Sequence, residues 1–123
     1  MHAERKTVVV TTDGDGNAIF YSERVTGKVS AIHYVKGDFA NGVDFTITSE
    51  DTGQSLWTET DVNASTVRAP RQATHLNSSG AAALYAAGGA AVLEPIVLAN
   101  DRVKIAIAQG GAAKSGTFHI VMG

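Results

Sequence analysis

Hydrophobic and polar residues alternate most clearly between positions 25 and 49, which read VTGKVSAIHYVKGDFANGVDFTITS. A period of two is typical of a β-strand with one buried face. The alternation occurs in two runs that are separated by a turn rich in Gly, Asp and Asn. We therefore expect one strand over residues 25–36 and another over residues 43–48. The first run is apolar on both faces in places, which favours a central position in its sheet.

Further strands are expected where β-branched and aromatic residues gather between turn residues: 6–12, 18–22, 55–58, 96–99, 102–108 and 117–122. The turn over residues 13–17 favours a hairpin between the first two of these, and the turn over residues 50–53 favours a hairpin between 43–48 and 55–58. About eight short strands predict an all-β, single-domain β-sandwich over residues 1–123, similar to a jelly roll.

Residues 60–91 interrupt this pattern. Strand patterning fades after Val67, and the segment continues into the alanine- and glycine-rich sequence GAAALYAAGGAA. Alanine is the best helix former, so one interpretation is a short helix that Ser79 caps and that ends at 88–89. The other interpretation is a flat loop of small residues packed against a neighbouring molecule. The sequence leaves both open.

Composition narrows the classes of function. The chain has 123 residues, of which 44% are hydrophobic and 18% charged, with a net charge of −2 and no cysteine. The absence of cysteine excludes disulfides, thiolate catalysis and cysteine-ligated zinc. The Lys and Arg residues are scattered, so a nucleic-acid partner is not expected. The apolar run 80–92 is too short and too rich in glycine to span a membrane, and synthesis in the cytoplasm is expected.

Several motifs could carry chemistry, and each has a simpler interpretation. The sequence Asp13-Gly-Asp-Gly-Asn17 resembles the start of a calcium loop, but Ala18 and Arg24 occupy the positions where an EF-hand requires glycine and an acid. We therefore predict a plain turn. Three histidines (His33, His75 and His119) could meet in space, but no two of them have the local spacing of metal ligands. We expect no metal site.

Catalysis has even less support. There is no G-x-S-x-G nucleophile elbow, and residues 109–116 lack the second glycine and the following helix of a phosphate-binding loop. We predict that the protein is not an enzyme and binds no cofactor. The single tryptophan, Trp57, is expected in the core or at an interface.

An interface is the remaining candidate for a site. Arg68 and Arg71 flank Pro70, and Leu84 and Tyr85 are the only large apolar residues in the alanine-rich pad that follows. Tyrosine and arginine are enriched among the residues that dominate binding energies. We therefore predict that Arg68, Arg71, Leu84 and Tyr85 contact another subunit or a larger assembly.

Five blocks of sequence carry a family resemblance: VSAIHYVKGDFANGVDFTIT, Thr52-Gly-Gln-Ser-Leu-Trp57, Pro70-Arg-Gln-Ala-Thr-His75, GAAALYAAGGAAV and ANDRVKIAIAQGGAAKSGTFHI. In this order they resemble small accessory proteins encoded within the virion structural modules of tailed bacteriophages and prophages. The resemblance spans roughly residues 25–121. The resemblance implies a location in the virion, and it carries over no catalytic residue.

The resemblance implies a non-enzymatic component of the virion, namely a protein that decorates and stabilises the head shell. Decoration proteins are commonly small β-rich trimers, so the implied partners are the chain itself and the major capsid protein of the same phage. Two alternatives are a neck or tail subunit, as part of the tube or an adaptor, and a carbohydrate-binding jelly-roll module. No nucleic acid or membrane partner is implied.

Overall fold

The structure is a computed structural model that describes residues 3–73, 78–79 and 93–123. All regular secondary structure in these residues is β, and no helix occurs in them. The ten strands are β1 (Glu4–Thr11), β2 (Ala18–Tyr21), β3 (Val25–Val35), β4 (Val43–Ser49), β5 (Ser55–Val62), β6 (Thr66–Arg68), β7 (Arg71–Ala73), β8 (Leu93–Asp101), β9 (Val103–Ala108) and β10 (Ser115–Met122).

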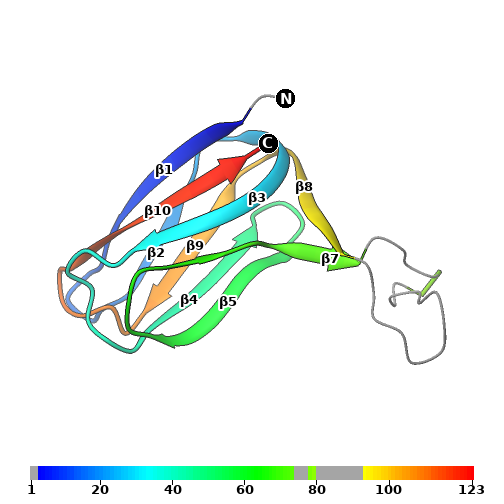
Figure 1. Cartoon of the computed structure of the whole chain (residues 1–123). Helices are drawn as coiled ribbons and strands as arrows, with labels where there is room; N and C mark the ends of the chain where they lie inside the picture. The colour runs from blue at the N-terminus through cyan, green and yellow to red at the C-terminus, as the bar shows by residue number, and fades with distance from the viewer. Residues whose placement is uncertain (1–2, 74–77, 80–92) are drawn as a thin grey trace.

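The strands form two antiparallel sheets packed face to face (Figure 1). Sheet A has the order β1-β10-β3-β8-β7, and the short strand β6 pairs with the C-terminal half of β3. Sheet B has the order β2-β9-β4-β5. The all-β sandwich that the sequence predicted is therefore confirmed.

The pairing of the strands is nested along the chain. Strand β1 pairs with β10, β2 with β9, β3 with β8, and β4 with β5. Successive pairs alternate between sheet A and sheet B, as they do when a long hairpin wraps around a barrel-like core. With β6 and β7 set aside, eight strands in this arrangement form a jelly roll.

The core lies between the sheets and consists of the inward-facing side chains of both. Its centre is an aromatic cluster in which Tyr34, Phe118 and Trp57 surround Phe45, with ring centroids 4.6 Å, 5.1 Å and 5.2 Å from that of Phe45. Trp57 is only 5% exposed. It therefore belongs to the core, which was one of the two places that the sequence predicted for it.

Close packing also fixes one glycine. Gly116 lies on β10, and a Cβ atom there would approach Cε2 of Phe39 to 2.5 Å. Phe39 itself is 2% exposed and comes from the loop between β3 and β4. Only a residue without a side chain lets that ring close the end of the sandwich.

One predicted hairpin is wrong and the other is confirmed. Strands β4 and β5 pair around the turn over residues 50–53, as expected. Strands β1 and β2 do not pair with each other, because residues 12–17 cross from sheet A to sheet B. The polar groups of this crossing bond instead to the loop between β9 and β10: Gly110 N–H donates to Gly16 O, and Ala113 N–H donates to Asp13 O.

The alternation in β3 also differs from a simple two-residue period. Val29, Ile32 and Tyr34 are buried, whereas His33 and Val35 face outwards. The register against β10 shifts between Val121 and Met122, so an extra residue is inserted in β3 near Ser30 and the buried face changes parity there. Strand β3 is central in sheet A, as its apolar character on both faces predicted.

The predicted interruption contains β6 and β7. Both add to sheet A, β6 beside the C-terminal half of β3 and β7 beside β8. Residues 80–91, for which the sequence allowed either a short helix or a flat loop, lie outside the described residues. Neither interpretation is therefore decided.

Candidate functional site

The outward-facing side chains of sheet A form the most distinctive surface of the described residues. We call this surface the sheet A face. It is a flat array in which neighbouring strands place side chains beside one another, and its members are Arg5, Thr7, Val9, Lys28, Ala31, His33, Val35, Val67, Arg71, Leu93, Val97, Thr117, His119 and Val121.

The sheet A face is unusually apolar for a surface in contact with solvent. Seven large apolar side chains are exposed among the described residues, and five of them lie on this face: Val9 (57%), Val35 (45%), Val67 (46%), Leu93 (60%) and Val97 (57%). Contiguous exposed apolar surface in a small domain commonly marks a site of interaction.

The charge on this face has one sign. The chain has twelve Asp and Glu residues, yet none lies among the members of the sheet A face, whose ionisable side chains are those of Arg5, Lys28, Arg71, His33 and His119. Asp38 lies at the rim, where its carboxylate accepts the N–H of Ser115 at 2.6 Å. A face without acids on a chain of net charge −2 is suited to an acidic partner.

Two histidines sit at the centre of this face. His33 and His119 are direct cross-strand partners, and the row continues to Thr7 on β1 and Val67 on β6. The Thr7 hydroxyl lies 3.0 Å from Nδ1 of His119. Together with Arg5, Val35 and Val121, the two imidazoles line a shallow hollow of about 270 Å³. The structure thus brings together two of the three histidines that the sequence singled out, while His75 lies outside the described residues.

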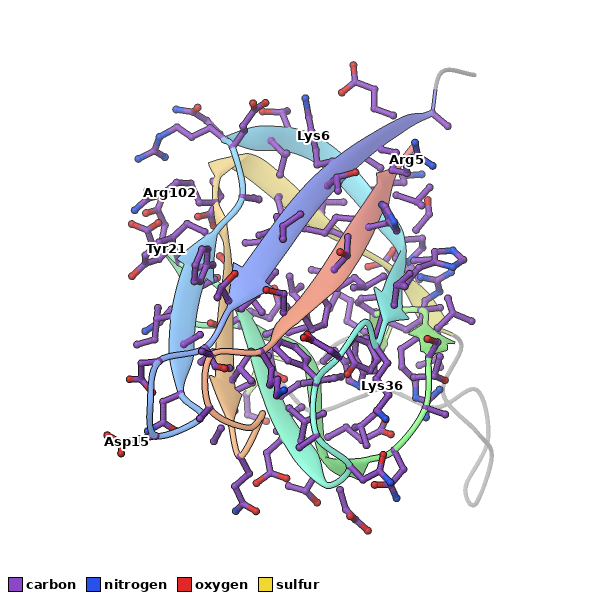
Figure 2. The ribbon with its side chains drawn as sticks, turned by 90° about the vertical axis from the view of Figure 1, so that its left-hand side faces the viewer. Arg5, Lys6, Asp15, Tyr21, Lys36 and Arg102 are labelled. Atoms are coloured by element: carbon purple, nitrogen blue, oxygen red, sulfur yellow. The ribbon has the colours of Figure 1, made fainter. Side chains whose placement is uncertain are left out.

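Figure 2 looks onto the edge of the sandwich formed by β1 and β2, with β10 beside β1. Arg5 projects on the side of sheet A, and Tyr21 and Arg102 lie together on the opposite side. The outer face of sheet B differs in character. It carries Thr46, Thr58, Ala106 and the exposed Ile19 in one cross-strand row, and Lys104 beside Tyr21 in the next.

Arg68, one of the predicted interface residues, is engaged within the molecule. Its guanidinium forms a two-pronged ion pair with Glu59, at 2.8 Å and 3.0 Å, and lies 5.7 Å from the ring centre of Trp57. Burial alone would raise the pKa of Glu59, but hydrogen bonds from Arg68 and Trp57 outweigh burial and lower that pKa. Arg68 thereby closes the edge of the sandwich over Trp57.

Arg71, the second predicted arginine, belongs to the sheet A face but is anchored to the backbone. Its guanidinium donates to Ser30 O at 3.1 Å and to Pro70 O at 2.7 Å. Ser30 lies where the partner of β3 changes from β8 to β6, so Arg71 satisfies a carbonyl that the sheet leaves open. Leu84 and Tyr85 lie outside the described residues, so their predicted role stays a prediction.

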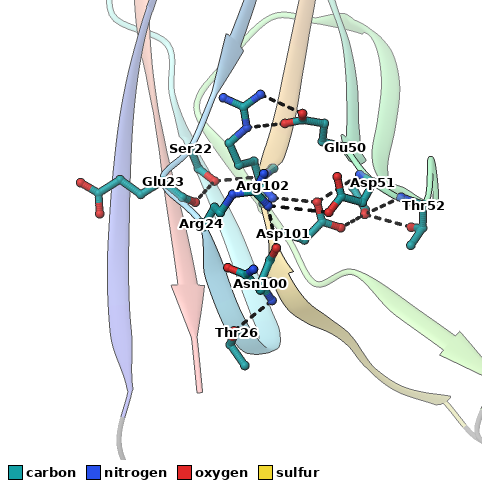
Figure 3. A network of polar contacts seen from close by, with 12 residues as sticks. Ser22, Glu23, Arg24, Thr26, Glu50, Asp51, Thr52, Asn100, Asp101 and Arg102 are labelled. Atoms are coloured by element: carbon teal, nitrogen blue, oxygen red, sulfur yellow. Dashed lines mark hydrogen bonds and ion pairs between the residues drawn. The ribbon is translucent and has the colours of Figure 1, made fainter.

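A second polar cluster joins β2, the β4–β5 turn and the β8–β9 turn at one end of the sandwich (Figure 3). The carboxylate of Asp101, 3% exposed, accepts hydrogen bonds from the Ser49 hydroxyl and from the N–H groups of Asp51 and Arg102. Burial alone would raise the pKa of Asp101, but these bonds hold it below its usual value. Since three donors already occupy this carboxylate, the cluster stabilises turns and is a poor catalytic base.

The same cluster contains the Arg102–Glu50 ion pair. Two nitrogens of Arg102 bond to the two carboxylate oxygens of Glu50, and the guanidinium lies 4.2 Å from the ring centre of Tyr21. The hydrogen bond from Arg102 is the largest influence on Glu50 and lowers its pKa. Strand β2, the β4–β5 turn and the β8–β9 turn are therefore held together at one end.

The Asp13 segment is a turn, as predicted. One carboxylate oxygen of Asp13 accepts the N–H groups of Asp15 and Asn17, at 2.9 Å and 3.0 Å. These backbone bonds lower the pKa of Asp13. A shallow hollow of about 460 Å³ opens beside it and is lined mainly by Ala18, Ile19, Ala106 and Ile107, without convergent polar groups.

Within the described residues, no group of three or more His, Asp or Glu side chains is arranged to hold a metal ion. A search of the same residues found no helix that is long and apolar enough to cross a membrane.

The sheet A face escaped the sequence analysis, although one signal pointed to it. Strand β1 contains three consecutive valines, and β3 ends with Val35 directly after the buried Tyr34. Apolar residues on both faces of a strand are typical of a central position in a sheet. For β1, which lies at the edge of sheet A, they indicate instead that the outer face is apolar as well.

Comparisons with known proteins found no matching family model, no matching curated protein and no matching solved structure.

Proposed function

We propose that the protein is a non-enzymatic structural component of a tailed-bacteriophage virion, which decorates the head by docking onto the shell of the major capsid protein. The observation that supports this most directly is the sheet A face, where five exposed apolar side chains and no carboxylate share one flat sheet. An exposed sheet face that carries only a shallow hollow is suited to contact with another protein surface.

The jelly-roll fold is compatible with this proposal, since it occurs in viral capsid proteins, but it occurs in lectins too. The order of sequence blocks that resembles phage accessory proteins favours the virion. Many copies on a repeating shell would bind by avidity, so each contact can be weak.

A structural role also agrees with the state of the polar side chains. His119 contacts the Thr7 hydroxyl rather than a carboxylate, and Asp101 is saturated by three donors. The Thr7–His119 pair places a hydroxyl beside an imidazole, but no carboxylate on the sheet A face orients that ring as a catalytic triad requires. The carbohydrate-binding alternative gains little, because Tyr21, the one exposed aromatic side chain among the described residues, already stacks with Arg102.

The proposal is tested on particles of the phage that encodes the chain, prepared without this protein. Purified protein is added, and its position is determined by cryo-electron microscopy. Ordered density on the head, at three-fold positions of the shell, is the expected result. A ring at the neck or tail would establish the tail alternative instead, and no added density on any part of the particle would contradict a virion role.

A further inference from the structure

The sheet A face has a centre that can receive an anion. We propose that this face docks an acidic and apolar surface of a partner protein, and that Arg5, His33 and His119 together receive a carboxylate of that partner. The inference rests on the proposed function in one respect only, namely that the expected partner is the capsid shell.

The geometry of the hollow supports this assignment. His33 and His119 are direct cross-strand partners, so their side chains leave the sheet about 5 Å apart on the same face. The Thr7 hydroxyl occupies Nδ1 of His119, which leaves Nε2 of that ring as its free nitrogen. Arg5 lines the same hollow and supplies a planar set of N–H donors that fits a carboxylate.

The surroundings of the hollow strengthen such a contact. Val35 and Val121 line it, Val67 continues the histidine row on β6, and Val9 lies two residues beyond Thr7 on β1. A charged hydrogen bond inside an apolar ring is shielded from water once the partner is in place, which raises its contribution to binding. The apolar ring therefore requires a partner that brings apolar side chains around its carboxylate.

The charge pattern favours a protein over a nucleic acid or a membrane. Besides the two histidines, the face carries only Arg5, Lys28 and Arg71, and the guanidinium of Arg71 is bonded to backbone carbonyls. Binding to DNA or RNA depends on many phosphate contacts, and membrane attachment depends on clusters of Lys and Arg. Two free cations among exposed valines fit neither requirement.

Among the described residues, no carboxylate faces the histidine pair. The groups that face it are Thr7 and Arg5 on β1, Val121 on β10, Val35 on β3 and Val67 on β6. A carboxylate that the partner brings therefore meets no acid from the described part of this chain at the pair.

The first experiment measures binding of the whole chain to particles that lack it. Wild type is compared with Arg5→Glu, with the double variant His33→Ala, His119→Ala, and with a control, Lys104→Glu, that places the same charge change on the outer face of sheet B. We expect Arg5→Glu to bind at least about tenfold more weakly, and Lys104→Glu to bind as wild type. The double histidine variant should also bind more weakly, because it removes two of the three side chains that receive the carboxylate.

Thermal melts show whether each variant is folded. If Arg5→Glu is unstable, Val67→Asp replaces it, because Val67 is 46% exposed on the short strand β6 and its substitution leaves the core intact. Folded variants that bind particles as tightly as wild type would overturn the inference while the virion role stands.

The second experiment removes the particle. A synthetic peptide of alternating glutamate and leucine is titrated into the protein, and NMR shifts of backbone amides locate its site. Shifts confined to β1, β10 and β3, and lost in Arg5→Glu, support the inference even if the protein fails to bind particles, in which case only the proposed function is wrong. Shifts elsewhere, or preferential binding to phosphatidylserine vesicles or to duplex DNA, would overturn it.

Discussion

The hydroxyl of Tyr34 is buried without a hydrogen-bond partner among the described residues. The side chain is 1% exposed and packs against Phe45 and Phe118, and burial raises the pKa of its hydroxyl to about 12. A buried polar group without a partner costs about 1–3 kcal/mol relative to its hydrated state. At this position the aromatic ring stabilises the core, whereas the unpaired hydroxyl lowers the stability of the fold.

Removing that hydroxyl should stabilise the protein. We expect Tyr34→Phe to raise the free energy of unfolding by about 1 kcal/mol and the melting temperature by roughly 4 °C. The measurement is a thermal melt followed by circular dichroism. Tyr34→Leu serves as the control and should melt below wild type, because it also removes the aromatic contacts. A Tyr34→Phe variant that melts below wild type would show that the hydroxyl has a partner, such as a buried water.

At the scale of strands and turns, two contacts between distant segments organise the ends of the sandwich. At one end, the carboxylates of Asp101 and Glu50 join the β4–β5 turn to the β8–β9 turn. At the other end, the loop residue Phe39 covers Gly116 of β10. Both contacts hold together loops that are far apart in the sequence. Breaking either contact should therefore lower the free energy of unfolding.

The contact formed by the carboxylates of Asp101 and Glu50 makes the stability of the fold depend on pH. The pKa values of Glu50 and Asp101 lie below their usual values in the folded chain, so the unfolded chain takes up protons first as the pH falls. Their stabilisation is present above about pH 4.5 and is lost as the pH falls through the folded-state pKa values. Melting temperatures should therefore be level from about pH 7 to pH 5 and fall below about pH 4.

Asp101→Asn is the matched control for this acid dependence. It keeps the shape of the side chain but removes the charge, so it should melt below wild type at neutral pH and lose less on acidification. An equally steep decline in the variant would show that other carboxylates carry the effect.

The second contact is tested by adding a single methyl group. Gly116→Ala would place a Cβ atom against the ring of Phe39, so the ring must move, and we expect a loss of about 1–3 kcal/mol. Gly14→Ala is the control, because nothing lies within 4 Å of a Cβ atom at that position. Chemical denaturation measures both variants. Equal stability of the two would contradict the role assigned to Phe39.

The sequence predicted the strands better than their partners. Valine and isoleucine at alternate positions identify β3, β4 and β9, because the pleat makes alternation a local property. Pairing is not local: residues 13–17 suit a hairpin turn as well as a crossing between sheets, and the partner of Thr7 is His119, on the last strand. For the same reason the sheet A face was missed, since it is assembled from strands that only the fold places side by side.

At the scale of the whole molecule, the two faces of the sandwich are unlike. The sheet A face carries five exposed large apolar side chains and is basic, whereas the outer face of sheet B carries threonine, alanine, the exposed Ile19 and the Tyr21–Lys104 row. The acids lie at the turns, the edges and the outer face of sheet B, as Asp13, Asp44, Glu59 and Asp101 illustrate. A molecule with this asymmetry can present one side to a neighbour and the other to solvent.

We predict that the chain forms a homo-oligomer, and that the oligomer is a trimer. The low charged fraction, 18%, and the alanine- and glycine-rich sequence GAAALYAAGGAA both favour burial of part of the surface by other copies. Light scattering on purified protein measures the mass directly. A single species of monomer mass at tens of micromolar, roughly the concentration at which weak oligomers form, would contradict assembly in solution.

The nested pairing of strands also determines when the chain can fold. Strand β10 lies between β1 and β3 and brings Phe118 and Ile120 to the core. Met122 on β10 pairs with Glu4 on β1, near the other end of the sequence. During synthesis, sheet A therefore stays divided until the ribosome has released the residues up to Met122. Folding must be late and slow, because almost every pairing closes a long loop, and the incomplete chain exposes strand edges that aggregate readily.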